Sequence, residues 1–317
     1  MTIQKKILVL VDGSERTIQT VNYIKDFMHV DENTQIVLFH VFSGIPEQYR
    51  DLELYLNCAN TVDQLKNREI SEKKKILTYL EASKKILISG GFSEQSIEIK
   101  FHCLEKGIAR DIIEEAKKGY TAVVMRRRGM GVLRNIILGS VAVKLLQSLT
   151  FVPVIIVGQI PPVKKILLAV DSSPDSMKAV EFVASFIGDC EYDMTILHAI
   201  PGLGAINFDL PELNMLAFPE ISMSDSCIES FKFNVARLFK DVREILARSG
   251  LKSQNISEKI ISGVLSRSDA IVNEAEEGGY STIVVGRRGL SKVEAFFMGR
   301  VGHEVVYGGK KFTVWVV

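Results

Sequence analysis

The sequence contains the same pattern twice, and this repeat limits the possible folds more than any other feature. Residues 7–14 read ILVLVDGS and recur at 166–173 as ILLAVDSS. Further along, residues 120–129 read YTAVVMRRRG and recur at 280–289 as YSTIVVGRRG. Repeats of this length indicate two copies of one domain, so a site proposed in one copy can be compared with the other.

The repeat predicts one domain at residues 1–158 and a second at 163–317, with a linker at about 158–162. The length of 317 residues also favours two domains rather than one. The dipeptide Pro161-Pro162 marks the predicted linker.

Charge and composition argue against nucleic acid or a membrane as a partner. The 39 basic and 38 acidic side chains leave a net charge of +1, which gives no broad field to attract an anionic surface. No apolar run is long enough to cross a bilayer, and residues 1–6 do not resemble a signal peptide. We therefore expect a cytoplasmic protein. The four cysteines show no C-x-x-C spacing, so neither disulfides nor a metal site is predicted.

Short apolar runs alternate with helical patterns in each copy. The run Ile7–Val11 is nearly continuous, which is typical of a strand covered on both faces, and Ser14 can cap a helix that follows. Because strands that alternate with helices need parallel crossovers, each copy is predicted to be α/β, a doubly wound Rossmann-like parallel sheet with helices on both faces. The predicted strands are 7–11, 36–41, 97–101, 122–125 and 154–157, then 166–170, 194–199, 257–261, 282–285 and 314–317.

A glycine-rich segment follows the fourth predicted strand of each copy. Residues 286–300 read GRRG, nine residues and GR, and residues 126–140 read RRRG, nine residues and GS. Glycines allow backbone amides to approach an anion, and the last glycine precedes a helix whose N-terminus favours negative charge. The segment therefore predicts a phosphate site. The alternative interpretation is a plain connection from strand to helix, with Ser140 as an ordinary cap.

An aspartate ends the first strand of each copy, Asp12 and Asp171. Ligands of doubly wound sheets bind beyond the carboxyl ends of the strands, where strand order reverses. At that place the carboxylate could accept hydrogen bonds from a sugar or a base. The alternative role is a helix cap.

Each copy resembles a universal stress protein domain over essentially its whole length. The residues that carry the resemblance are Val11–Glu15, His40-Val41, Gly107–Ala116, Gly129 with Gly139-Ser140, and Phe151–Val154. The resemblance implies a five-stranded parallel sheet of the adenine nucleotide alpha hydrolase-like type. It also implies that ATP or AMP binds at the carboxyl edge of the sheet, with Mg as part of the bound nucleotide.

The resemblance implies a set of nucleotide-binding residues in each copy. In the second copy these are Ala169, Asp171, Ala199, Val285, Gly286, Gly289, Gly299, Arg300 and Val301. In the first copy they are Leu10, Asp12, Val41, Met125, Gly129, Gly139, Ser140 and Val141.

Each copy departs once from the family motif, Gly-x-x-Gly, nine residues, then Gly-Ser or Gly-Thr. Arg126 replaces the first glycine in the first copy, and Arg300 replaces the hydroxyl residue in the second. A side chain at 126 should crowd the approach to a nucleotide, whereas Arg300 exchanges a neutral donor for a cation. We therefore expect the second copy to be the better site.

No catalytic constellation is predicted. His40 and His198 fall on strand ends and are interpreted as structural, since no nucleophile or acid is placed beside them by the sequence. Adenylyl transfer or phosphate cleavage is disfavoured because H-I-G-H-like and P-loop lysine signatures are missing. At most, weak ATP hydrolysis is implied by the family.

The predicted function is a stress-response sensor or adaptor that binds an adenine nucleotide and presents a changed surface to a protein partner. The alternative is a tandem scaffold whose sites have degenerated. The apolar segments 42–56 and 201–228 are predicted to cover a core or to form a lid or partner surface. The family resemblance also implies that the last strands, 154–157 and 314–317, pair within the chain, and a homodimer remains an option.

Overall fold

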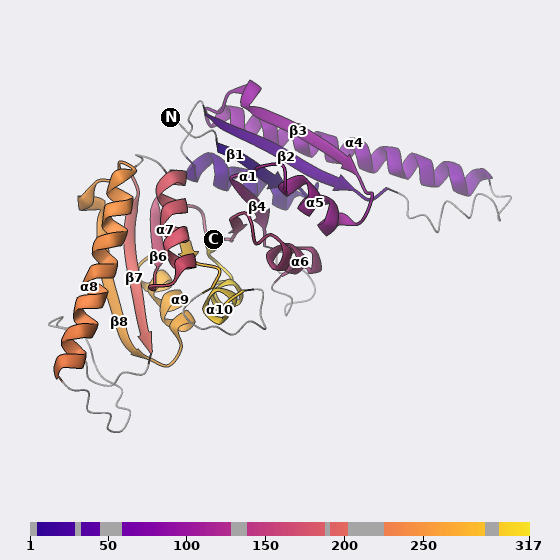
Figure 1. The fold of residues 1–317 in the computed structure, drawn as a ribbon. Coiled ribbons are helices and arrows are strands. Elements are labelled where there is room, and N and C mark those ends of the chain that lie inside the picture. The colour runs from indigo at the N-terminus through magenta and orange to yellow at the C-terminus, as the bar shows by residue number, and fades with distance from the viewer. Residues whose placement is uncertain are drawn as a thin grey trace. The chain divides into compact units, whose positions relative to one another are not determined.

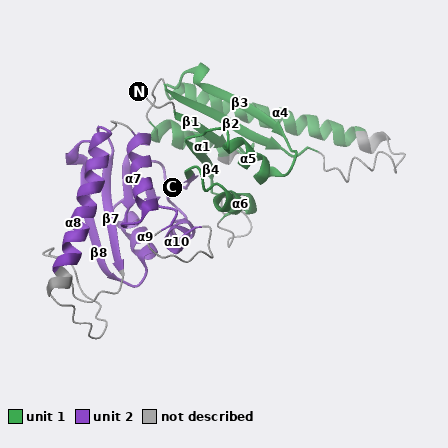
Figure 2. Ribbon diagram, viewed as in Figure 1, with its two compact units in different colours: residues 1–154 green, residues 155–317 purple. Residues whose placement is uncertain are grey.

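The computed structural model describes residues 5–28, 33–44, 59–127, 138–187, 191–201, 225–288 and 298–317 (Figure 1). The chain divides into two compact units, residues 1–154 and 155–317 (Figure 2). The division falls a few residues before the expected linker. Within the second unit, the Gly158 amide donates to Thr313 Oγ1 at 3.1 Å and the Gln159 amide donates to the Lys311 carbonyl at 2.7 Å.

The first unit is a parallel sheet with the strand order β3-β2-β1-β4. Its helices pack in pairs, α1 with α4 and α5 with α6. The elements are β1 (Lys5–Leu10), α1 (Glu15–Phe27), β2 (Thr34–Phe42), α4 (Ala59–Ser89), η1 (Glu94–Ser96), β3 (Ile97–Cys103), α5 (Ile108–Ala116), β4 (Ala122–Arg126), α6 (Ser140–Ser148) and β5 (Val154–Val157), which begins at the end of this unit.

The second unit repeats this order with β10-β9-β6-β7-β8, and all these neighbours are parallel. The helix pairs are α7 with α8 and α9 with α10. The elements are β6 (Lys165–Ala169), α7 (Pro174–Ile187), β7 (Asp193–Pro201), α8 (Asp225–Arg248), η2 (Ser253–Asn255), β8 (Ile256–Val264), α9 (Arg267–Glu277), β9 (Thr282–Val285), α10 (Arg300–Gly308) and β10 (Thr313–Val316). The predicted doubly wound α/β fold is confirmed.

The central strands are apolar on both faces because helices cover both faces. Ile7, Leu8 and Val9 of β1 are all fully buried, as are Ile166, Leu167 and Leu168 of β6. A strand with one face in water would alternate apolar and polar residues, so the continuous runs in the sequence already indicated parallel strands.

Two sequence-based expectations lie beyond what the structure describes. Residues 45–58 and 202–224 are outside the described ranges, so the role of the apolar segments 42–56 and 201–228 stays a prediction. The pairing of β5 with β10 concerns how the two copies associate, and it also stays a prediction. Within the described residues, no helix is long and apolar enough to span a bilayer.

Candidate functional site

A cavity of ≈ 610 Å³ lies at the carboxyl ends of the strands in the first unit, and we call it site 1. It is lined by seven of the eight residues predicted for this copy, Leu10, Asp12, Val41, Met125, Gly139, Ser140 and Val141. The eighth, Gly129, falls outside the described residues. The sequence did not indicate the contribution of α4, which adds Glu72 and Ile76 to the wall. Ile108, the first residue of α5, also lines the cavity.

Asp12 is held in place by the turn between β1 and α1. Its Oδ1 accepts hydrogen bonds from the Ser14 amide at 3.0 Å, the Ser14 hydroxyl at 2.6 Å and the Thr17 hydroxyl at 2.8 Å. Burial by itself would raise the pKa of Asp12, but these hydrogen bonds and the nearby His40 outweigh it and lower the pKa. An ionised acceptor therefore lies at the edge of site 1 at neutral pH.

The Asp12 contacts correct a detail of the sequence analysis. Ser14 occupies the N-cap position of α1, but its side chain makes no capping hydrogen bond to the helix. The hydroxyl instead donates to Asp12. In the second unit Asp171 Oδ1 likewise accepts the amide and the hydroxyl of Ser173, but the Ser173 Oγ also accepts the Ser176 amide at 3.2 Å and so caps α7. The repeated aspartate is thus the acceptor that organises the turn in both copies.

His40 also lines site 1, and its contacts support a structural role. Its Nδ1 lies 2.6 Å from the Val11 carbonyl, and His198 Nδ1 lies 2.7 Å from the Val170 carbonyl. Because a carbonyl only accepts, Nδ1 carries the hydrogen in both rings. Burial lowers the pKa of His40 although the Val11 carbonyl and Asp12 act in the opposite direction. The ring is therefore neutral at pH 7 and ties two strand ends together.

The N-terminus of α6 also lines site 1. Gly139 is the N-cap residue and Ser140 is the first helical residue, so the interpretation of Ser140 as the cap is wrong. The first amides of a helix have no partner within the helix, and they carry the positive end of its dipole. Amides in this position can bind an anionic group that enters the cavity.

Arg126 extends β4 by one residue and lines site 1. Its guanidinium donates to Gln19 Oε1 on α1, so the side chain reaches towards the helix surface. Arg127 also lines the cavity and is 4% exposed. The two arginines place positive charge at the same end of the sheet as the α6 N-terminus. We expected the Arg126 side chain to crowd the approach of a nucleotide, but the cavity that it lines is large.

The equivalent cavity of the second unit, site 2, measures ≈ 60 Å³. Six of the nine predicted residues line it, namely Ala169, Asp171, Ala199, Val285, Gly286 and Val301. Gly289 falls outside the described residues. Arg300 binds Glu304 through its Nε at 2.8 Å, and its side chain is 84% exposed. The arginine that we expected at the phosphate end thus points to solvent in this structure.

Gly286 lines site 2 at a place where the backbone of α7 approaches β9 closely. A Cβ atom at this position would lie 2.8 Å from the backbone of Asp175 and Ser176 at the start of α7. A side chain at this position would have to push α7 away from β9, whereas Arg126 occupies the equivalent position in the first unit. The glycine of the family motif is therefore needed here for close packing of strand and helix.

We predict that Gly286→Ala lowers the free energy of unfolding by about 1–3 kcal/mol, because the added methyl must push α7 away from β9. Chemical denaturation followed by circular dichroism measures this change. Gly308→Ala is the matched control, since a Cβ there would meet nothing closer than 3.8 Å. Equal destabilisation by the two substitutions would contradict the packing role of Gly286.

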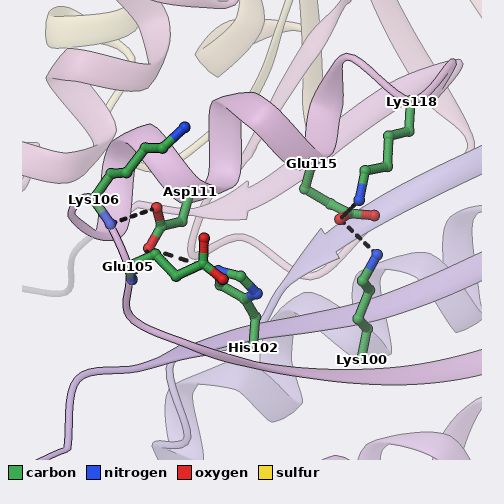
Figure 3. A network of polar contacts seen from close by, with 7 residues as sticks. All are labelled: Lys100, His102, Glu105, Lys106, Asp111, Glu115 and Lys118. Atoms are coloured by element: carbon green, nitrogen blue, oxygen red, sulfur yellow. Dashed lines mark hydrogen bonds and ion pairs between the residues drawn. The ribbon is translucent and has the colours of Figure 1, made fainter.

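A network of polar contacts centred on the buried carboxylates Asp111 and Glu115 joins α5 to β3 and to the turns beside them (Figure 3). Lys100 and Lys118 converge on the Glu115 carboxylate at 2.6 and 2.9 Å, and the Tyr120 hydroxyl donates to it at 2.6 Å. In the second unit, Lys259 binds Glu274 at 2.6 Å. The lysine on the third strand and the glutamate on the following helix thus recur in both copies, which indicates a structural role.

Asp111 closes the turn that leads into α5 (Figure 3). Its carboxylate accepts the amides of Glu105 and Lys106 at 2.9 and 3.0 Å. Burial would raise its pKa, but these amides and the neighbouring His102 lower it. No group of three or more possible metal-binding side chains occurs among the described residues. The polar contacts of Asp111 and Glu115 therefore stabilise the turn and the helix of the first unit.

The sequence matches the universal stress protein family twice, at residues 4–158 and 162–317. A doubly wound sheet in each copy, with a cavity at its carboxyl edge, is the architecture that the two matches share. The chain therefore belongs to the universal stress protein family and carries two of its domains in tandem.

Individual relatives are distant. The universal stress protein YxiE of Bacillus subtilis strain 168 is 28% identical over 141 residues, which is 44% of this chain and 90% of that protein. A universal stress protein structure from Archaeoglobus fulgidus DSM 4304 has 18% identity and a TM-score of 0.60, and covers 99% of this chain and 96% of its own. A universal stress protein solved in complex with cAMP is 20% identical, with a TM-score of 0.33, over 48% of this chain and 94% of its own.

Proposed function

We propose that this protein binds an adenine nucleotide, ATP or AMP, in site 1 and acts as a stress-response sensor or adaptor. The single observation that carries the proposal is the cavity of ≈ 610 Å³ at the carboxyl edge of the first sheet. Pockets for small ligands commonly measure about 300–1,000 Å³, and site 1 falls in this range. Site 2, at ≈ 60 Å³, does not. The proposal therefore reverses the order of the two copies that the motifs suggested.

The lining of site 1 offers the two kinds of chemistry that a nucleotide requires. Apolar side chains and the Asp12 carboxylate could bind a base and a ribose hydroxyl. The amides at the N-terminus of α6, together with the positive charge of Arg127, could bind phosphate oxygens. Mg would accompany ATP as part of the bound nucleotide.

Binding would act by stabilising one arrangement of the residues around the cavity, which changes the surface offered to a protein partner. No step of chemistry is needed for this function. The competing function, a scaffold without a ligand, is favoured by the departures from the family motif at Arg126 and Arg300. The two functions differ in one measurable respect, namely whether a nucleotide stabilises the folded protein.

We expect ATP-Mg or AMP to raise the melting temperature in a concentration-dependent manner, since a ligand that binds only the folded state stabilises it. The gain is about 2.7 kcal/mol at a concentration 100 times the Kd. Asp12→Ala should weaken binding by about tenfold or more, because it removes a charged acceptor. Calorimetric titration of each variant measures the Kd.

Asp171→Ala is the matched control, because it removes the equivalent carboxylate from site 2. Its Kd should equal that of the unchanged protein. Full binding by Asp12→Ala together with loss in Asp171→Ala would place the nucleotide in site 2 instead. The absence of any stabilisation by ATP-Mg or AMP would favour the scaffold function.

A further inference from the structure

The side chains that line the two cavities do not explain why site 2 is the smaller one. At two equivalent positions the second unit has the smaller residue, Ala169 for Leu10 and Ala199 for Val41. Smaller walls should leave a larger cavity, yet site 2 measures ≈ 60 Å³ and site 1 ≈ 610 Å³. Part of the difference in volume comes from α4, which contributes residues to the wall of site 1, whereas its counterpart α8 contributes none of its described residues to site 2. Another group must occupy the space beside Ala199.

That group is Arg267. It is the first residue of α9, and Ile108 is the first residue of α5 in the first unit. Both residues line their cavities. The Arg267 Nε donates to the Ala199 carbonyl at 3.2 Å, so the half-buried side chain reaches from the start of α9 to the end of β7 and lines the pocket between them. Ile108 has no polar atom in its side chain and leaves the equivalent space open.

We infer that the Arg267 side chain fills the space in site 2 that a ligand would need. The first residue of α5 or α9 then determines which copy can accept a ligand. The inference rests on the proposed nucleotide function and deepens it. Arg267 binds a backbone acceptor at the strand end, the kind of group that can recognise the amino group of a purine. A ligand that enters site 2 must displace the Arg267 side chain and leave its Nε without the Ala199 carbonyl as acceptor.

Site 2 contains other charged groups besides Arg267. Arg288 lines site 2 together with Arg267, and the Asp171 carboxylate lines it as well. Removing the Arg267 guanidinium would free the Ala199 carbonyl while keeping Asp171 and the amides at the start of α10, where Gly299 is the N-cap residue. The second copy therefore retains polar groups that could bind a nucleotide, but the Arg267 side chain excludes the nucleotide.

The experiment exchanges the two residues in the full-length chain and titrates each protein with AMP and with ATP-Mg by calorimetry. Arg267→Ile gives the second unit the residue that the first unit has at this position, and we expect the stoichiometry to rise from one nucleotide per chain to two. Ile108→Arg copies the second unit into the first, and we expect binding at site 1 to be lost or weakened by about tenfold or more. Arg248→Ile, on an arginine that is 77% exposed on α8, controls for the loss of one positive charge.

Further variants separate the possible results. Adding Asp171→Ala to Arg267→Ile should remove only the gained site, and Arg267→Ala replaces Arg267→Ile if the latter fails to fold. A stoichiometry that stays at one in a folded Arg267 variant overturns the inference and leaves the proposed function intact. If the unchanged protein binds no nucleotide but Arg267→Ile binds one, the proposed function fails and the inference holds. If neither protein binds, both fail.

Discussion

Trp315→Ala is expected to lower the free energy of unfolding by about 3–5 kcal/mol, the largest effect of any single substitution considered for this chain. Trp315 lies in β10 and is fully buried. It meets the edges of two rings of α7, Phe182 at 5.7 Å and Phe186 at 5.2 Å between ring centroids. Truncation removes these contacts and leaves a cavity that the surrounding sheet cannot fill by relaxation. Chemical denaturation monitored by circular dichroism measures the loss.

The matched control is Phe233→Ala on α8, whose side chain is 67% exposed. Removing an aromatic ring from the surface is expected to change the free energy of unfolding by no more than about 0.5 kcal/mol. The comparison separates burial from the mere loss of an aromatic group. Similar losses for the two substitutions would show that burial of Trp315 does not determine its contribution to stability.

The stability of the first unit is expected to fall as the pH decreases from about 4.5 to about 2, and Glu115 should account for a distinct part of this loss. Burial would raise the pKa of Glu115, but hydrogen bonds from Lys100, Tyr120 and Lys118 outweigh it and lower the pKa to about 2. In the unfolded chain the pKa is near 4.5. A lowered pKa means that the stabilisation is fully present above 4.5 and disappears as the folded carboxylate is protonated.

Glu115→Gln is expected to cost about 1–3 kcal/mol at pH 7, because an amide cannot replace an ionised acceptor of three donors. The same substitution should flatten the dependence of the unfolding free energy on pH between about 4.5 and 2. Denaturant titrations at a series of pH values measure both quantities.

Glu114→Gln is the control for this experiment, because it removes the neighbouring carboxylate from the same helix. The Glu114 side chain is 54% exposed and pairs with Lys117 at 2.8 Å. Exposed ion pairs contribute little in water, so Glu114→Gln should retain most of the acid dependence. An unchanged pH profile in Glu115→Gln would mean that other carboxylates govern unfolding in acid.

Much of the fold could be read from the sequence, because the signals for it are local. Continuous apolar runs at Ile7–Val11 and Ile166–Val170 indicate strands covered on both faces, and the structure buries both runs except for the half-buried Leu10 and Ala169. The regular spacing of Leu80 and Leu87 places one side of α4 in the core, where both residues are fully buried. The internal repeat in the sequence then predicted two copies of the domain.

The candidate sites were predicted only in outline. The motif identified the residues at the strand ends, since the carboxyl ends of parallel strands necessarily meet at one edge of the sheet. It did not identify Arg267 or Ile108 as lining residues, because they begin α9 and α5, outside the glycine-rich segments, and only the fold brings them to the cavities. Nor could it foresee that Arg300 binds Glu304.

By itself the sequence determined that the chain contains two doubly wound domains of one family, because apolar periodicity and repetition are properties of consecutive residues. Only the tertiary structure decided which copy keeps an open cavity. The volume beside Ala199 depends on a guanidinium brought there by α9, and the spacing of β9 and α7 depends on the absence of a side chain at Gly286. Cavity size results from packing between distant elements, and residues that are separated in sequence set it together.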